Sequence, residues 1–376
     1  MKLTILQEKL KEGLSIVEKI SLKSLTLPIL NNILISAEKN FLNLSSTDLE
    51  IGINWWSLSK IEEEGKITIP SKLFSNFINL LPNKKINIKT KNNDILIECE
   101  NYFTQIKGLS SDEFPIIPNI KKNEFISLKS SIFCQSLNQI VDIPLLSNSR
   151  PEISGIYFLF QKNAITMVST DSFRLGEKKI IFKNEQKLTN NYSLILPQKT
   201  AKEIINIFNT KDRDLNIYLS SNQIMFETLM TETNYPEIQV VSKLIEGEYP
   251  DYKEIIPLKY NTQIILNKDE FLNRLRISGL FTGKTNEVKI KTNLNKNELE
   301  IFNQNKDIGE YNSKLPVKII GENIEVCFNY KFLIDGISNI KSSEIILELN
   351  GDDGPAILKP VGDDTYIYVV MPIKSD

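Results

Sequence analysis

The chain of 376 residues contains no histidine. Histidine is the most common general base of enzymes and a frequent metal ligand. Its absence excludes imidazole metal sites and every serine–histidine or cysteine–histidine nucleophile. Catalysis by carboxylates or lysine alone is not excluded. The missing residue therefore narrows the possible enzyme classes without removing them all.

Cysteine is also scarce. Cys99, Cys134 and Cys327 are far apart in the sequence and stand among apolar residues. An odd number of widely separated cysteines is not typical of a disulfide framework or a structural metal site. We expect three buried thiols in a reducing cytosol, no metal and no cofactor.

Long apolar runs are missing as well. No run approaches the roughly 20 residues that a membrane-spanning helix requires, and Met1–Thr4 enters a strand pattern at once, without a signal peptide. We therefore expect a cytoplasmic protein with no membrane partner. At 41% hydrophobic residues, the chain has enough apolar material for several cores.

The sequence does contain short motifs that recur at long distances along the chain. Leu44–Asp48 (LSSTD) recurs as Met167–Asp171 (MVSTD), and Ile69–Phe74 (IPSKLF) recurs as Leu196–Ala201 (LPQKTA) and, more faintly, as Phe328–Leu333 (FNYKFL). The copies are roughly 125 residues apart, far more than the repeats of solenoid proteins, so whole domains are duplicated.

Proline-containing segments separate the copies. Glu113–Pro118 (EFPIIP) closes the first copy, and Glu248–Tyr252 (EYPDY) closes the second. Proline cannot continue a central strand, so both segments are interpreted as extended linkers. We predict three domains, at residues 1–118, 119–250 and 251–376, each large enough for its own core.

The first copy shows the secondary structure most clearly. Leu10, Leu14, Val17 and Ile20 recur with the spacing of one helix face, and Leu73, Phe77 and Leu80 are predicted to form the apolar face of a second helix. Alternating segments between turn residues predict strands at 3–6, 41–44, 51–53, 66–69, 86–89, 95–99 and 103–106. Each domain is therefore predicted to be α+β, with two helices packed on antiparallel sheet.

Two segments resemble catalytic motifs but are interpreted as turns. Gly279–Thr285 (GLFTGKT) has three residues between its glycines where a phosphate-binding loop has four, and it follows a helical pattern instead of a strand. Gly351–Pro355 (GDDGP) has adjacent acids, whose side chains would point to opposite faces of a strand. The repeated Ser-Thr-Asp segments are likewise interpreted as turns in which Asp caps backbone amides.

Six ordered motifs resemble the bacterial sliding clamp family, the beta subunit of DNA polymerase III. The resemblance runs from Met1 to the C-terminus and follows the three-domain repeat. The motifs are 25–30 (LTLPIL), 46–50 (STDLE), Arg150–Pro151 with Gly155, 170–175 (TDSFRL), 246–252 (EGEYPDY) and 368–372 (YVVMP).

The resemblance implies a non-catalytic processivity factor that forms a ring-shaped homodimer around duplex DNA. Twelve helices of about 10 Å diameter would leave an opening of roughly 25–30 Å around a duplex about 20 Å wide. A head-to-tail contact that closes after two chains gives a finite ring. The implied partners are double-stranded DNA of any sequence, the DNA polymerase III alpha subunit, the clamp loader complex, a 3'–5' exonuclease complex, and mismatch repair and ligase proteins with clamp-binding motifs.

The chain as a whole is not basic, because Lys and Arg number 45 against 47 for Asp and Glu. A clamp that slides needs phosphate attraction without base-specific contacts. The predicted DNA-facing residues lie mostly on the polar faces of the helices, and Lys23 stands near a loop position that is often basic in the family. They are Lys11, Lys19, Lys23, Lys72, Arg150, Lys199, Lys202, Arg276 and Lys331.

The resemblance also implies a groove that binds peptides of partner proteins. Its apolar residues would take apolar anchors, and Arg174 would donate hydrogen bonds to the peptide. Glu254 and Ser375–Asp376 depart from the family pattern. The implied groove residues are Ile153, Thr170, Ser172, Phe173, Arg174, Leu175, Pro250, Ile255, Pro355, Val370, Met371, Pro372 and Ile373.

Two further hypotheses remain to be tested. Apolar side chains at unpaired sheet edges are predicted to join the two copies, through Phe103 and Ile106 on one side and Ile277 and Leu280 on the other. The alternative to a clamp is a carboxylate-dependent enzyme of duplicated domains, with Asp171, or Asp352 and Asp353, as acid or metal ligand.

Overall fold

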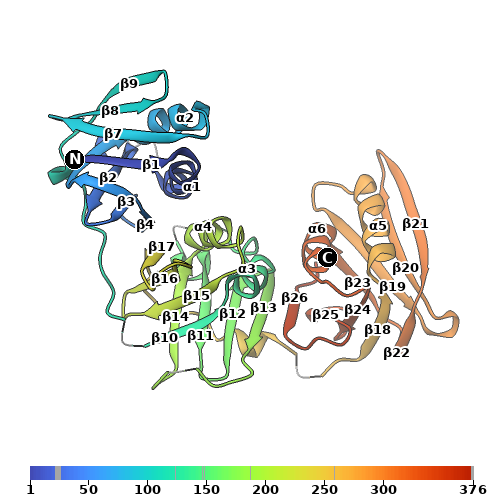
Figure 1. The fold of residues 1–376 in the computed structure, drawn as a ribbon. Helices are drawn as coiled ribbons and strands as arrows, with labels where there is room; N and C mark the ends of the chain where they lie inside the picture. Colours follow the sequence, from blue (N-terminus) through green and yellow to red (C-terminus); the bar gives the residue numbers. More distant parts are fainter. Residues whose placement is uncertain are drawn as a thin grey trace. The chain divides into compact units, whose positions relative to one another are not determined.

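The computed structural model describes residues 1–21, 27–122, 124–145, 147, 149–186, 188–257 and 259–373. Figure 1 shows the helices and strands, coloured along the sequence. Contacts divide the chain into two compact units. The first comprises Met1–Cys134, Gln186–Thr189 and Lys202–Leu244, and the second comprises Gln135–Glu185, Asn190–Ala201 and Ile245–Asp376.

The first unit contains two antiparallel sheets. The five-stranded sheet has the order β5 (Lys60–Glu63), β1 (Lys2–Leu6), β7 (Lys85–Lys91), β8 (Asp94–Cys99) and β9 (Tyr102–Lys107). The eight-stranded sheet has the order β10 (Phe125–Lys129), β15 (Asp214–Leu219), β16 (Gln223–Leu229), β17 (Pro236–Lys243), β4 (Ile51–Leu58), β3 (Phe41–Thr47), β2 (Asn32–Glu38) and β6 (Gly65–Pro70). Pairing of β17 with β4 joins the first and second thirds of the sequence.

Helix α1 (Gln7–Val17) packs on this eight-stranded sheet through the face predicted from its spacing. Leu10, Leu14 and Val17 are buried, and Ile20 is buried in the 3-10 turn that follows. A Cβ atom at Gly13 would lie 2.4 Å from the Trp55 ring in β4, so only glycine allows this close approach.

Helix α2 (Ser71–Leu80) buries a different face from the one predicted. Leu80 is 84% exposed and Leu73 is also exposed, so the prediction for this helix was wrong. The buried residues are Ser71, Phe74, Ser75 and Ile78. Serine is small enough to let α2 approach its neighbours, and the Ser71 hydroxyl accepts a hydrogen bond of 2.7 Å from the Ser21 hydroxyl.

The second unit also contains two antiparallel sheets. Its nine-stranded sheet has the order β14 (Tyr192–Pro197), β11 (Gly155–Phe160), β12 (Ala164–Thr170), β13 (Arg174–Ile181), β26 (Tyr366–Val370), β25 (Ala356–Pro360), β24 (Glu344–Leu349), β18 (Thr262–Asn267) and β22 (Lys318–Gly321). The four-stranded sheet has the order β21 (Gly309–Pro316), β20 (Glu298–Asn305), β19 (Glu287–Asn293) and β23 (Glu325–Asn329).

Helices α5 (Lys268–Ser278) and α6 (Tyr330–Ser338) pack against each other in the second unit. Helices α3 (Ser130–Asn138) and α4 (Gln198–Phe208) each have residues in both units. Every recorded pairing between the named strands is antiparallel, and the predicted α+β class with antiparallel sheets is confirmed.

The segments that resemble catalytic motifs are turns. Gly279–Phe281 forms a 3-10 turn (η6) directly after α5, and the Thr282 hydroxyl donates to the Gly279 carbonyl at 3.0 Å. Gly351 lies in a turn after β24 with φ of 75°.

The three cysteines are free and buried, and burial raises the pKa of Cys134 to about 12. Within the described residues, no helix is both long and apolar enough to cross a bilayer.

Candidate functional site

The end of the chain lies beside the repeated Ser-Thr-Asp turn of the second unit. Strand β26 pairs with β13 so that Val370 is opposite Arg174, and Val369 is opposite Leu175. Directly after this pairing, the backbone N–H of Met371 donates to the Phe173 carbonyl at 2.8 Å. The structure therefore brings together two segments that are almost 200 positions apart in the sequence.

Most residues of the predicted groove lie near this junction. Ile153, Thr170, Leu175 and Val370 are buried, and Ser172, Phe173, Ile255 and Met371 are exposed. Pro250, Pro355, Pro372 and Ile373 are half-buried. Pro355 directly precedes β25, whose first residue Ala356 is opposite Val370. Ile373 differs from the others, because its backbone N–H donates to the Cys327 carbonyl in β23.

The floor of this region includes residues that the sequence interpretation omitted. Leu175 and Val369 form a buried cluster with Val168, Tyr252 and Ile357. The Tyr157 ring stacks on Tyr249 with 5.1 Å between centroids, and Tyr249–Lys253 lines a cavity of about 310 Å³. Tyr249 and Tyr252 belong to the linker motif at 246–252, which could have indicated them as candidate site residues. Their place in the floor depends on tertiary packing.

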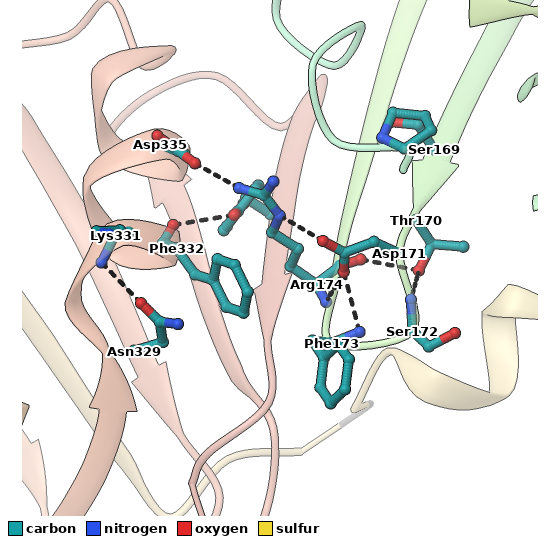
Figure 2. Close-up of polar contacts among 12 residues, drawn as sticks. Ser169, Thr170, Asp171, Ser172, Phe173, Arg174, Asn329, Lys331, Phe332 and Asp335 are labelled. Atoms are coloured by element: carbon teal, nitrogen blue, oxygen red, sulfur yellow. Dashed lines mark hydrogen bonds and ion pairs between the residues drawn. The ribbon is translucent and has the colours of Figure 1, made fainter. Parts of the chain in front are cut away.

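Asp171 builds the turn that precedes β13 (Figure 2). Its Oδ1 accepts hydrogen bonds of 3.0 Å from the backbone N–H groups of Phe173 and Arg174. Ser172 has φ of 74°, and the Thr170 hydroxyl donates to the Arg174 carbonyl at 2.8 Å. Asp171 therefore has a structural role as a cap, as the turn interpretation predicts.

Arg174 is already engaged within the protein. Figure 2 shows its guanidinium between two carboxylates, with Nε 2.8 Å from Asp171 and Nη1 2.5 Å from Asp335 in α6. The side chain is 8% exposed and lies over the Phe332 ring at 4.6 Å. Burial lowers the pKa of Arg174, but Tyr368 and the two carboxylates outweigh burial and raise it above its usual range. A peptide would have to compete with these partners for the guanidinium donors.

The predicted DNA-facing residues are mostly exposed on helices. Lys11 lies on α1, Lys72 on α2, Lys199 and Lys202 on α4, Arg276 on α5, and Lys331 on α6. Arg150 is exposed and lies 3.6 Å from the Glu152 carboxylate. Lys23 lies outside the described residues.

Lys19 also has a partner within the protein. It is exposed, its ammonium donates to the Asn206 carbonyl at 2.9 Å, and partial desolvation lowers its pKa. This ammonium therefore already has a backbone partner.

The predicted contact residues between copies have different environments. Phe103 is 68% exposed on β9, an edge strand of its sheet, whereas Ile106 on the same strand is 5% exposed and belongs to the core. Ile277 and Leu280 are exposed, but they lie in α5 and η6 and not on a sheet edge. Phe103 is therefore available for contact at the sheet edge, Ile106 is not because it is buried, and Ile277 and Leu280 are exposed outside the sheet edges.

The alternative of a carboxylate-dependent enzyme is not supported. The described residues contain no group of three or more potential ligands that could hold a metal ion. Asp171 is engaged by Arg174 and backbone amides, and Asp352 and Asp353 lie exposed in a turn. The repeated aspartate is therefore explained by turn chemistry.

Comparison with known proteins identifies the family. Models of the N-terminal, central and C-terminal domains of the DNA polymerase III beta subunit match residues 1–118, 127–251 and 253–374. The chain is 28% identical over 363 residues to a beta sliding clamp of Staphylococcus epidermidis and 26% identical over 360 residues to that of Staphylococcus aureus, with 93% of each chain covered.

Solved structures agree along the whole chain. The sliding clamp of Bacillus subtilis matches with a TM-score of 0.93, 24% identity and 100% of both chains covered. A structure described as a DNA polymerase III beta subunit from Eubacterium rectale matches with a TM-score of 0.90, 30% identity and 99% of both chains covered. The chain therefore belongs to the DNA polymerase III beta subunit family, the sliding clamps, which are non-catalytic processivity factors.

Proposed function

We propose that two copies of this chain close head to tail around duplex DNA and hold DNA polymerase III on its template in the cytoplasm. The observation that carries the proposal is the match of three consecutive clamp domains along almost the entire chain. We retain domain boundaries at 118/119 and 250/251 as part of the proposal.

The contact between copies is proposed to include β9 and the exposed face of α2. The edge strand β9 has unpaired backbone groups and carries the exposed rings of Tyr102 and Phe103. Leu73 and Leu80 add exposed apolar surface on α2 of the same unit. On the other side of the contact, we propose η6 with Leu280, together with the edge strand β21. Edge strands and exposed apolar side chains favour β-pairing between chains.

The exposed basic residues of the helices are proposed to face DNA. Their ammonium and guanidinium groups can attract phosphates without reading base edges, as sliding requires. Diffuse attraction of this kind is compatible with a chain whose formal net charge is −2.

The groove beside Met371 is proposed to bind apolar anchors of partner peptides. Phe173 and Met371 supply exposed apolar surface above the buried floor of Leu175 and Val369. Methionine adapts its shape to different anchors. The proposed partners are the polymerase alpha subunit, the clamp loader complex, the 3'–5' exonuclease complex, and mismatch repair and ligase proteins.

Retention on DNA of different topology tests the ring. The chain, loaded by a clamp loader, should remain on closed circular DNA during gel filtration and should be lost when the circle is cut once. Only a closed ring dissociates over free ends. Equal retention on both forms, or a monomeric mass at micromolar concentration, would contradict the proposal.

A further inference from the structure

The turn before β4 has the same two aspartate hydrogen bonds as the turn before β13. Asp48 Oδ1 accepts from the backbone N–H groups two and three residues later, at 3.0 and 2.7 Å. Asp171 Oδ1 accepts from the same two positions (Figure 2). Both of these bonds are 3.0 Å long. The residue after each aspartate has a left-handed backbone, with φ of 75° at Leu49 and 74° at Ser172. The two turns therefore present their neighbouring side chains in the same way.

The strand pairing beside each of the two turns is also repeated. β17 pairs with β4 in the first unit as β26 pairs with β13 in the second. The N–H of Lys243 donates to the Glu50 carbonyl at 2.9 Å, and the N–H of Met371 donates to the Phe173 carbonyl at 2.8 Å. Lys243 thus occupies the position of Met371, the proposed peptide anchor.

The first unit has a cavity at this repeated position. It measures about 260 Å³ and lies between the turn, the Pro115–Pro118 linker and the ends of β16 and β17. Ile116, one of its lining residues, is 93% exposed, whereas the neighbouring Ile117 packs against a core cluster. The residues that line it include Leu49, Ile51, Ile116, Gln223, Val241 and Lys243.

The lining differs from that of the other junction in charge. Leu49, Ile51 and Val241 supply apolar walls suited to an aliphatic side chain. At the rim, the charged residues Glu50 and Lys243 stand where the second unit has Phe173 and Met371. Lys243 supplies an ammonium with which an acidic ligand side chain can pair, and Glu50 is the carboxylate that opposes such a ligand.

We propose that this cavity is a second peptide-binding site. Its ligand is an extended segment of a partner protein that inserts one aliphatic side chain and places an acidic side chain beside Lys243. The peptide class rests on the proposed function of the groove at Met371, whereas the site and its charge preference rest on the first unit alone. One chain would then hold two peptides of different charge at equivalent positions.

Photo-crosslinking of the full-length chain tests this site. The probe is the peptide acetyl-Gly-Asp-Leu-Asp-Gly-amide with a photoreactive leucine, and mass spectrometry locates the label. We expect label at Leu49, Ile116 or Val241. Lys243→Glu should weaken probe binding about 3-fold to 10-fold, and Glu50→Lys should strengthen it about 2-fold to 5-fold, as expected for exposed charge pairs. Both side chains are exposed, so both variants should fold.

A second probe with lysine in place of aspartate gives the matched control. Its preference for the two variants should be reversed. Absence of label in the cavity, or label that responds to neither charge substitution, would overturn the proposal. A change in self-association in Lys243→Glu would also overturn it, because the occupant would then be a second copy.

The position of the crosslink distinguishes the proposed second site from the groove at Met371. Label around Leu49 but not around Phe173 and Met371 supports the second site, and the groove of the second unit is tested separately with a clamp-binding peptide. Label around Phe173 and Met371 alone overturns the second site and leaves the groove in place.

Discussion

Met371 combines partial exposure with a fixed position, which suits a peptide anchor. Its N–H is bound to Phe173, and its side chain is 36% exposed. The position is set by β-pairing of the preceding residues, so the side chain can be shortened without moving the backbone. Anchors of this kind carry much of the binding free energy of an interface.

Met371→Ala should weaken binding of a clamp-binding peptide about 5-fold to 150-fold, since loss of an anchor contact costs about 1–3 kcal/mol. Calorimetric titration measures this affinity, and sedimentation should show an unchanged mass. Ile181→Ala, at the exposed far end of β13, is the control and should bind normally. Unchanged affinity in Met371→Ala would remove Met371 from the site.

Asp171 and Asp48 cap equivalent turns but differ in burial and in the residue three positions later. Asp171 contacts the Arg174 guanidinium, whereas the residue at the corresponding position after Asp48 is Ile51. The Asp171 side chain is almost fully buried. The charge of Asp171 therefore compensates a charge in the interior.

Asp171→Asn should lower the free energy of unfolding by about 3–5 kcal/mol, because removal of one partner leaves a buried charge less compensated. Asp48→Asn retains an oxygen for the turn at a half-buried position and should therefore cost less than Asp171→Asn. Urea titration of both variants measures the difference. A small effect of Asp171→Asn would contradict the stabilising role of the Asp171 charge.

At the scale of elements, α2 shows how two apolar stripes compete on one helix. Its sequence offers Leu73, Phe77 and Leu80 on one side and Phe74 and Ile78 on another. The second stripe is buried because serines at 71 and 75 let it approach its neighbours closely. The first stripe remains exposed, which fits a role in the contact between copies.

Phe103→Asp combined with Leu80→Asp should convert the dimer into a monomer, because two charges would have to be desolvated in the contact. Analytical ultracentrifugation at micromolar concentration measures the mass. Ile181→Asp places the same charge at another exposed apolar position and should leave the dimer intact. A dimeric double variant would exclude β9 and α2 from the contact.

At the scale of the whole molecule, strands from different thirds of the sequence pair within each compact unit. Each compact unit contains one junction, β17 with β4 in the first and β13 with β26 in the second. The two compact units therefore do not coincide with the three family domains. The models of those domains match residues 1–118, 127–251 and 253–374. The middle third of the sequence contributes strands to both units.

Retention of the ring on DNA should depend on salt but not on base sequence. The Lys199→Gln and Lys202→Gln double variant should reduce the slope of log affinity against log salt concentration by about one for each lost phosphate contact. Salt-dependent binding to two duplexes of unrelated sequence measures both properties. Strong discrimination between the duplexes, or an unchanged slope, would contradict the assignment of these lysines to the DNA-facing surface.

The sequence by itself determined the features that depend on local spacing and repetition. The buried face of α1 follows from Leu10, Leu14 and Val17, and the turns at Asp48 and Asp171 follow from side chains that bond backbone amides two and three residues away. The absence of histidine limits the possible chemistry through composition alone. Local interactions span one or two turns of chain, so a short segment is enough to specify them.

Only the tertiary structure decided which segments meet and which side chains are buried. Arg174 and Asp335 are 161 residues apart, and their contact occupies a guanidinium donor that the sequence interpretation assigned to the peptide. The burial of Ile106 and the exposure of Leu80 likewise depend on neighbours that no local pattern specifies. Burial is a property of all the elements packed around a residue, and strand register across a junction is set by that packing.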